Sequence, residues 1–67
     1  MKKKAVIEAL NGVKCLVDDI SDRGARIHLA AAAEVPTEFY LTIKGEERPR
    51  YCAVVRRKPL QLSVYFV

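Results

Sequence analysis

The 67-residue sequence has few of the residues that metal centres and disulfide frameworks need. It has no tryptophan, one histidine and two cysteines, Cys15 and Cys52, which do not form a Cys-x-x-Cys pair. A zinc site needs more ligands at closer spacing. A disulfide needs an oxidising compartment, which nothing else in the sequence indicates. Both cysteines lie in apolar runs, so we expect buried free thiols and no metal.

Long apolar runs are also missing. The longest, residues 29–33, is far too short to cross a bilayer. The basic start at Lys2, Lys3 and Lys4 is followed by Glu8, which interrupts the apolar region that a signal peptide would need. We therefore predict a cytoplasmic protein without membrane contact.

No catalytic motif is present. The sequence contains no G-x-x-x-x-G-K-[ST], G-x-S-x-G or H-E-x-x-H. Asp18 and Asp19 are adjacent, so on a strand they point to opposite faces and make a poor carboxylate pair. His28 alternates with apolar neighbours and points away from the core. A chain this short also has little room for both a core and an enclosed cleft, and we expect no enzyme.

The residues that are present describe one globular domain. Hydrophobic residues make up 51% of the chain and charged residues 30%, a folded rather than a disordered composition. The net charge of +4 suits an anionic ligand and, less specifically, nucleic acid. A single domain over residues 1–67 is expected, with residues 1–4 as a flexible basic tail.

Apolar residues recur with period two, which predicts strands. A two-residue turn at Asn11-Gly12 suits the first connection. Residues 30–34 are the only helical candidate, and Pro36 limits them to a single turn or a loop. Closure would remove both sheet edges, so the expected fold is all-β, a small six-stranded antiparallel β-barrel. The six predicted strands are 5–10, 13–17, 25–29, 39–43, 51–57 and 60–66.

The alternation also predicts which side chains face inward. For Phe66→Ala we expect a loss of about 3–5 kcal/mol if the ring is fully buried. The predicted core consists of Val13, Cys15, Val17, Ala25, Ile27, Leu29, Phe39, Leu41, Ile43, Leu62, Val64 and Phe66.

A polar turn separates the second and third predicted strands. Residues 19–24 read DISDRG. Aspartate and serine side chains accept hydrogen bonds from nearby backbone N–H groups and so build tight turns. Gly24 supplies either a positive φ or a close backbone approach. A structural role is therefore sufficient to explain this segment.

The same segment resembles the second sequence motif of PilZ domains, Asp-x-Ser-x-x-Gly followed by a Gly-Ala-Arg-Ile strand. Residues 35–41 look like the family's proline-containing loop and next strand, and residues 52–57 and 62–67 look like its closing strands. The resemblance covers nearly the whole chain after Gly12. It implies a six-stranded barrel that acts in bacterial signalling as a receptor for cyclic-di-GMP, with no other cofactor.

The resemblance also implies ligand-binding residues. Asp19 would accept hydrogen bonds from guanine N–H groups, and Ser21 would donate to a phosphate or accept from the backbone. Gly24 would allow close approach, and Arg23 would reach the anion. The family's Arg-x-x-x-Arg motif is absent, because no arginine precedes Arg23. In its place stand Lys2, Lys3 and Lys4.

Lysine neutralises phosphate, but unlike arginine it neither stacks on guanine nor forms bidentate hydrogen bonds with phosphate. Four interpretations are compatible with these lysines: the ligand binds weakly, the sequence begins after the arginine motif, the chain is a degenerate family member that no longer binds nucleotide, or the lysines form a solvated tail.

Three functions are compatible with these residues. The first is a cyclic-di-GMP-binding or degenerate PilZ-like signalling module that acts through an unidentified protein partner. The second is a ligand-independent protein-interaction adaptor of the same fold. The third, ranked lowest, is a small nucleic-acid-binding barrel; Tyr40, Tyr51 and Tyr65 would stack on bases, but no aromatic-rich basic stripe accompanies them. A marginal core also favours a homodimer.

Overall fold

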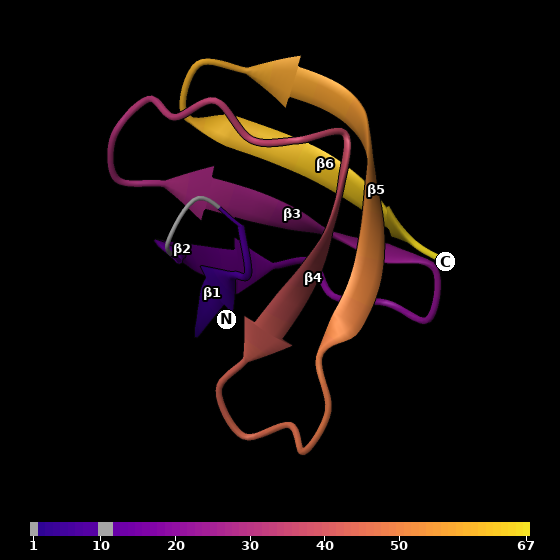
Figure 1. The fold of residues 1–67 in the computed structure, drawn as a ribbon. Coiled ribbons are helices and arrows are strands. Elements are labelled where there is room, and N and C mark those ends of the chain that lie inside the picture. The colour runs from indigo at the N-terminus through magenta and orange to yellow at the C-terminus, as the bar shows by residue number, and fades with distance from the viewer. Residues whose placement is uncertain (1, 10–11) are drawn as a thin grey trace.

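The computed structural model describes residues 2–9 and 12–67, and their regular structure consists entirely of β-strands (Figure 1). Neighbouring strands pair antiparallel in the order β1-β2-β3-β6-β5-β4, and β4 returns to pair with β1. The predicted closed six-stranded barrel is confirmed. Its strands are β1 (Lys3–Ile7), β2 (Val13–Asp18), β3 (Gly24–Leu29), β4 (Glu38–Ile43), β5 (Arg50–Lys58) and β6 (Gln61–Phe66).

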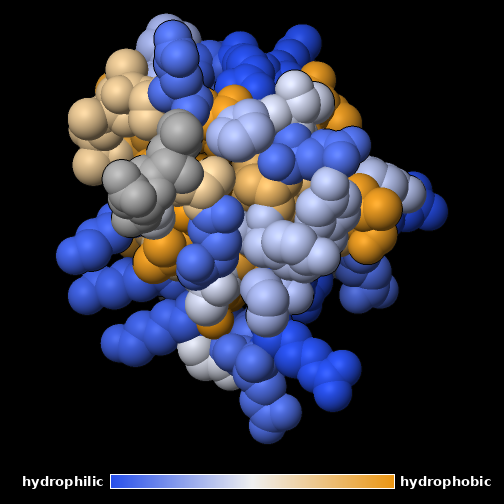
Figure 2. All heavy atoms as spheres, viewed as in Figure 1, coloured by the Kyte–Doolittle hydropathy of each residue, from blue (hydrophilic) through white to orange (hydrophobic). Residues whose placement is uncertain are grey.

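The core follows from the period-two alternation. In β4, Phe39, Leu41 and Ile43 are buried while Tyr40 and Thr42 are exposed, as expected for a sheet with one wet face. Hydrophilic side chains dominate the surface seen in Figure 2, with smaller hydrophobic areas between them.

The predicted core is confirmed apart from Val13 and Phe66, which are half-buried and pack against its margin. Four buried residues complete the core: Ala5, Ile7, Val35 and Cys52.

The first strand and its turn differ from the prediction. β1 ends at Ile7, which pairs with Val13, so the connection spans residues 8–12 rather than two residues. The Ala9 N–H bonds back to Ile7 O at 2.9 Å and takes the chain out of the ladder. Gly12 has the positive φ expected for it, 85°, whereas Asn11 lies outside the described residues.

The expected flexible tail also differs in the structure, which places Lys3 and Lys4 in β1. Their backbones pair with Val17 and Leu16 of β2. On the other side, the N–H of Lys44, just past β4, donates to Lys4 O at 2.8 Å. Ladder bonds on both sides therefore fix this segment.

Residues 30–37, between β3 and β4, form a loop without a helical turn. Within this loop Val35 is buried, and its carbonyl accepts a hydrogen bond from Arg57 Nη2 at 2.6 Å. The register of β5 against β6 shifts between Val54 and Arg56, and Val55 is 69% exposed at this bulge. A bulge re-aims the side chains that follow it.

The half-buried position of Phe66 lowers the expected cost of Phe66→Ala. The Arg50 guanidinium lies 4.6 Å from the ring centroid and is itself held by Glu46, with Nε to Oε1 at 2.8 Å. We expect the free energy of unfolding to fall by about 2 kcal/mol. About 0.5–1 kcal/mol of this loss comes from the cation–π contact with Arg50.

Urea unfolding of Phe66→Ala, of Arg50→Ala and of the double variant measures both the total loss of stability and the part that the two residues share. A loss as large as that of Leu41→Ala, at a fully buried position, would contradict this assignment.

Candidate functional site

Ser21 is the organising residue of the turn between β2 and β3. Its Oγ accepts hydrogen bonds from the backbone N–H groups of Arg23 (3.2 Å) and Gly24 (3.3 Å), and it donates to Gly24 O at 3.3 Å. The Ser21 N–H also donates to Gly24 O, at 2.9 Å. Of the two roles predicted for this hydroxyl, the geometry shows the backbone one.

Gly24 is required by the fold itself. A Cβ built on it would lie 2.1 Å from Val64 O, a backbone atom of β6. Gly24 pairs with Tyr65 across β3 and β6, and only a hydrogen fits between the strands. Its φ is not positive, so close backbone approach is the correct one of the two structural explanations.

Asp19 has an unusual backbone. Its φ is 50°, the only positive φ at a non-glycine position among residues 2–9 and 12–67. Aspartate tolerates this left-handed conformation better than most residues. The side chain is 66% exposed, and its Oδ2 lies 3.1 Å from Arg26 Nη1. The turn thus presents a carboxylate to solvent beside a guanidinium.

Arg26 belongs to a basic row on the outer face of the barrel. Ser63 of β6 pairs with Arg26 of β3 on one side and with Arg56 of β5 on the other. These three residues, with Lys58 and Gln61, line a hollow of about 60 Å³. Two arginines therefore flank Ser63, and one of them is in contact with Asp19.

Sequence reasoning identifies neither this hollow nor a role for Arg56. Alternation places Arg26 on the wet face, and both arginines then resemble ordinary solvated residues. Their proximity depends on β6 lying between β3 and β5, which no local pattern reveals. The only indication in the sequence is that alternation assigns no contact to either Arg26 or Arg56.

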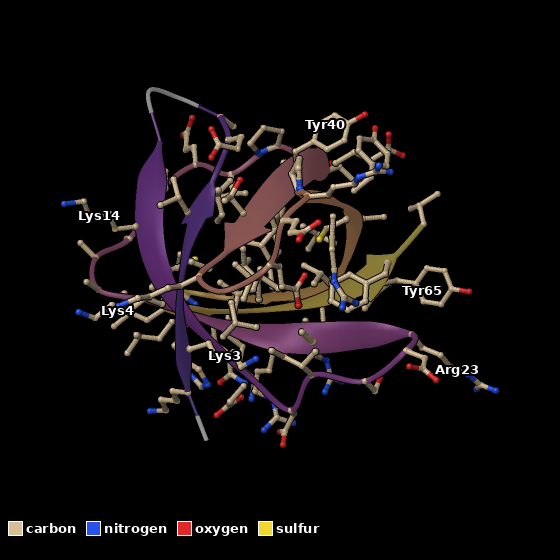
Figure 3. The ribbon with its side chains drawn as sticks, turned by 90° about the horizontal axis from the view of Figure 1, so that it is seen from below. Lys3, Lys4, Lys14, Arg23, Tyr40 and Tyr65 are labelled. Carbon is tan, nitrogen blue, oxygen red and sulfur yellow. The ribbon has the colours of Figure 1, made fainter. Side chains whose placement is uncertain are left out.

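Lys3 and Lys4 do not form one cluster with the turn. Lys3 pairs with Val17, two residues before Asp19, so the start of β1 lies beside the end of β2. Figure 3 shows Lys4 on the same side of the barrel as Lys14, with Arg23 and Tyr65 on the opposite side. The Arg23 side chain points away from the barrel, while its carbonyl accepts from Phe66 N–H.

Both cysteines are buried, and the Asp18 carboxylate is paired. Burial raises the pKa of both Cys15 and Cys52 to about 11, so each thiol is neutral at physiological pH and a poor nucleophile. Asp18 and Asp19 are separately engaged, because Asp18 Oδ2 lies 3.1 Å from His28 Nε2. The structure thus shows no joint role for the two carboxylates.

Two kinds of feature are absent from residues 2–9 and 12–67. No cluster of three or more histidine, cysteine, aspartate and glutamate side chains is arranged to hold a metal ion. No helix in this part of the chain is long and apolar enough to cross a membrane.

Comparison with known proteins gives a family. The family model described as PilZ domain matches residues 3–67. No curated protein and no solved structure matches the chain. The matched range contains all six strands and the turn at residues 19–24. The chain therefore belongs to the PilZ domain family.

Proposed function

We propose that this chain binds cyclic-di-GMP on the outer face of the barrel, beside the turn at residues 19–24, and signals through a protein partner. The observation that carries the proposal is the exposed Asp19 carboxylate, held by a left-handed backbone 3.1 Å from the Arg26 guanidinium. A carboxylate accepts hydrogen bonds from guanine N–H groups, and a guanidinium binds phosphate or stacks on a base.

In this proposal Arg26 and Arg56 contact the phosphates and bases in place of the family's Arg-x-x-x-Arg motif, which the sequence lacks. They flank Ser63 across two strand spacings, about 10 Å. Each guanidinium can then meet a different part of a ligand that carries two phosphates and two bases. Lys3, at the start of β1, and Lys2, just before it, add positive charge, but lysine neither stacks on a base nor binds phosphate through two parallel hydrogen bonds.

The binding should be weak and salt-sensitive, because exposed charges are screened beyond about 8 Å at physiological ionic strength. Isothermal titration of the full chain with cyclic-di-GMP tests the proposal. Asp19→Ala and Arg56→Ala are each expected to weaken binding about tenfold, the size of one charge-assisted hydrogen bond. Replacing Lys2 and Lys3 with alanine should have a smaller effect that disappears at high salt.

Arg48→Ala is the matched control, because Arg48 is exposed in the loop before β5. It lies eight residues from Arg56, about 26 Å along an extended chain. Equal affinity losses in the Arg48 and Arg56 variants would indicate non-specific attraction of the anion by the basic surface, and not a site. Absence of heat and of chemical-shift changes at every accessible ligand concentration would reject the receptor function.

A ligand-independent adaptor is the second candidate, and one observation favours it. Ser21 and Gly24 are fully explained by the turn and by the β3–β6 contact, so the motif is retained whether or not a nucleotide binds. The two functions differ in whether partner binding by the chain requires added cyclic-di-GMP.

A further inference from the structure

A concavity of about 600 Å³ lies on the outer face of the sheet formed by β4, β1, β2 and β3. Outward-facing side chains of neighbouring strands form its surface. Lys4 pairs with Leu16, and Leu16 with His28; Val6 pairs with Lys14. Its volume is within the range of pockets that hold ligands.

The floor of this groove is apolar, although it faces solvent. Val6 is half-buried and Leu16 is 39% exposed. The alternation that puts Ala5 and Cys15 in the core places Val6 and Leu16 on the outside, where polar residues are the rule. A concave surface with an apolar lining and a few polar groups is the usual form of a binding site.

Positive charge lies beside each apolar residue of this floor. Lys4 pairs with Leu16, and Lys14 pairs with Val6, across β1 and β2. Lys44 lies next to Lys4, because its N–H donates to Lys4 O. The groove is lined by three lysines, and no aspartate or glutamate lines it within the described residues. The complementary ligand has an apolar body with negative charge on more than one side.

We infer that this groove binds an extended segment of a partner protein in which apolar and acidic side chains alternate. Four strands at about 4.8 Å spacing give a floor about 14 Å across, the length of about four extended residues. Alternate residues of an extended segment point in opposite directions, so apolar side chains face the floor and acidic ones face away from it. The exposed lysines have long, flexible side chains that can reach these acidic groups from the groove. A fatty acid would offer a single carboxylate to cations that lie apart.

This inference does not rest on the proposed nucleotide site. Lys4 and Lys14 project from the side of the barrel opposite Arg23 (Figure 3), and Asp19 and Arg56 do not line the groove. Asp19→Ala should therefore leave the groove's affinity unchanged, and each proposal can fail while the other stands.

The test is a titration of the ¹⁵N-labelled full chain with a capped synthetic hexapeptide that alternates leucine with glutamate. We expect chemical-shift changes concentrated at residues 4–6, 14–16 and 42–44. Leu16→Glu should weaken binding at least tenfold, because it places negative charge on the floor. Leu60→Glu is the matched control, since Leu60 is 49% exposed elsewhere, and it should bind like the wild type.

Two further probes complete the test. A peptide with lysine in place of glutamate, and one with serine in place of leucine, should both fail to bind. Binding of the lysine peptide as tightly as the glutamate peptide would overturn the inference. So would equal affinity of the Leu16→Glu and Leu60→Glu variants, or binding of decanoate in the groove when the glutamate peptide does not bind.

Discussion

Gly24→Ala is expected to leave most of the protein unfolded at 25 °C. The added Cβ would lie 2.1 Å from Val64 O and 3.2 Å from Val64 C. Both are backbone atoms of β6, so relief requires the Gly24 end of β3 to move away from β6 and break the first pairs of their ladder. We estimate a loss of about 4–5 kcal/mol, at the upper end for single substitutions. A domain of this size has little more stability than that.

Gly45→Ala is the comparison. Its φ of 94° disfavours a side chain, but nothing lies within 4 Å of the position that a Cβ would take, so about 1–2 kcal/mol is expected from backbone strain alone. Thermal unfolding followed by circular dichroism ranks the two variants. A Gly24→Ala protein that melts at the temperature of the wild type would show that β3 and β6 are not in the register described.

The second large effect is a loss of stability at alkaline pH. Burial raises the pKa of Cys15 and Cys52 from 9.0 to about 11. Between these values the unfolded chain gives up thiol protons that the folded protein keeps, so the free energy of unfolding falls as pH rises. The loss begins near pH 9 and is complete above pH 11. Two pKa units correspond to about 2–3 kcal/mol per thiol.

Urea unfolding at about pH 8 and about pH 11 measures this loss in the wild type and in a variant with alanine at both cysteines. The variant should be less stable at the lower pH, because it has lost buried volume, but it should lose less on going to the higher pH. Tyr51, whose pKa is raised chiefly by its hydrogen bond to Glu38, titrates in both proteins and cancels in the difference. Identical losses would mean that the thiols are not buried as described.

Most of the barrel could be predicted because its strands alternate clearly. Phe39, Leu41 and Ile43 define the inner face of β4 without reference to any other strand. The connection after β1 could not be predicted in the same way. Ala9 and Gly12 bond to each other across the turn, and the Asn-Gly pair, read locally, favours a tighter hairpin than the register allows.

The candidate site was only partly predictable for a related reason. Asp19, Ser21 and Gly24 lie in one short motif and can be recognised together. Arg26 and Arg56 become neighbours only because β6 separates β3 from β5, a non-sequential arrangement that depends on the whole barrel. The bulge between Val54 and Arg56 also changes which residues of β5 face outward, and simple alternation does not register it.

The most direct measurement of the central claim is a heteronuclear NMR titration of the ¹⁵N-labelled full chain with cyclic-di-GMP. We expect saturable shift changes at residues 19–26 and at Arg56 and Ser63, with the amides of the loop at residues 44–48 unchanged. A spectrum that stays constant at every accessible ligand concentration, or shift changes confined to other parts of the barrel, would contradict it.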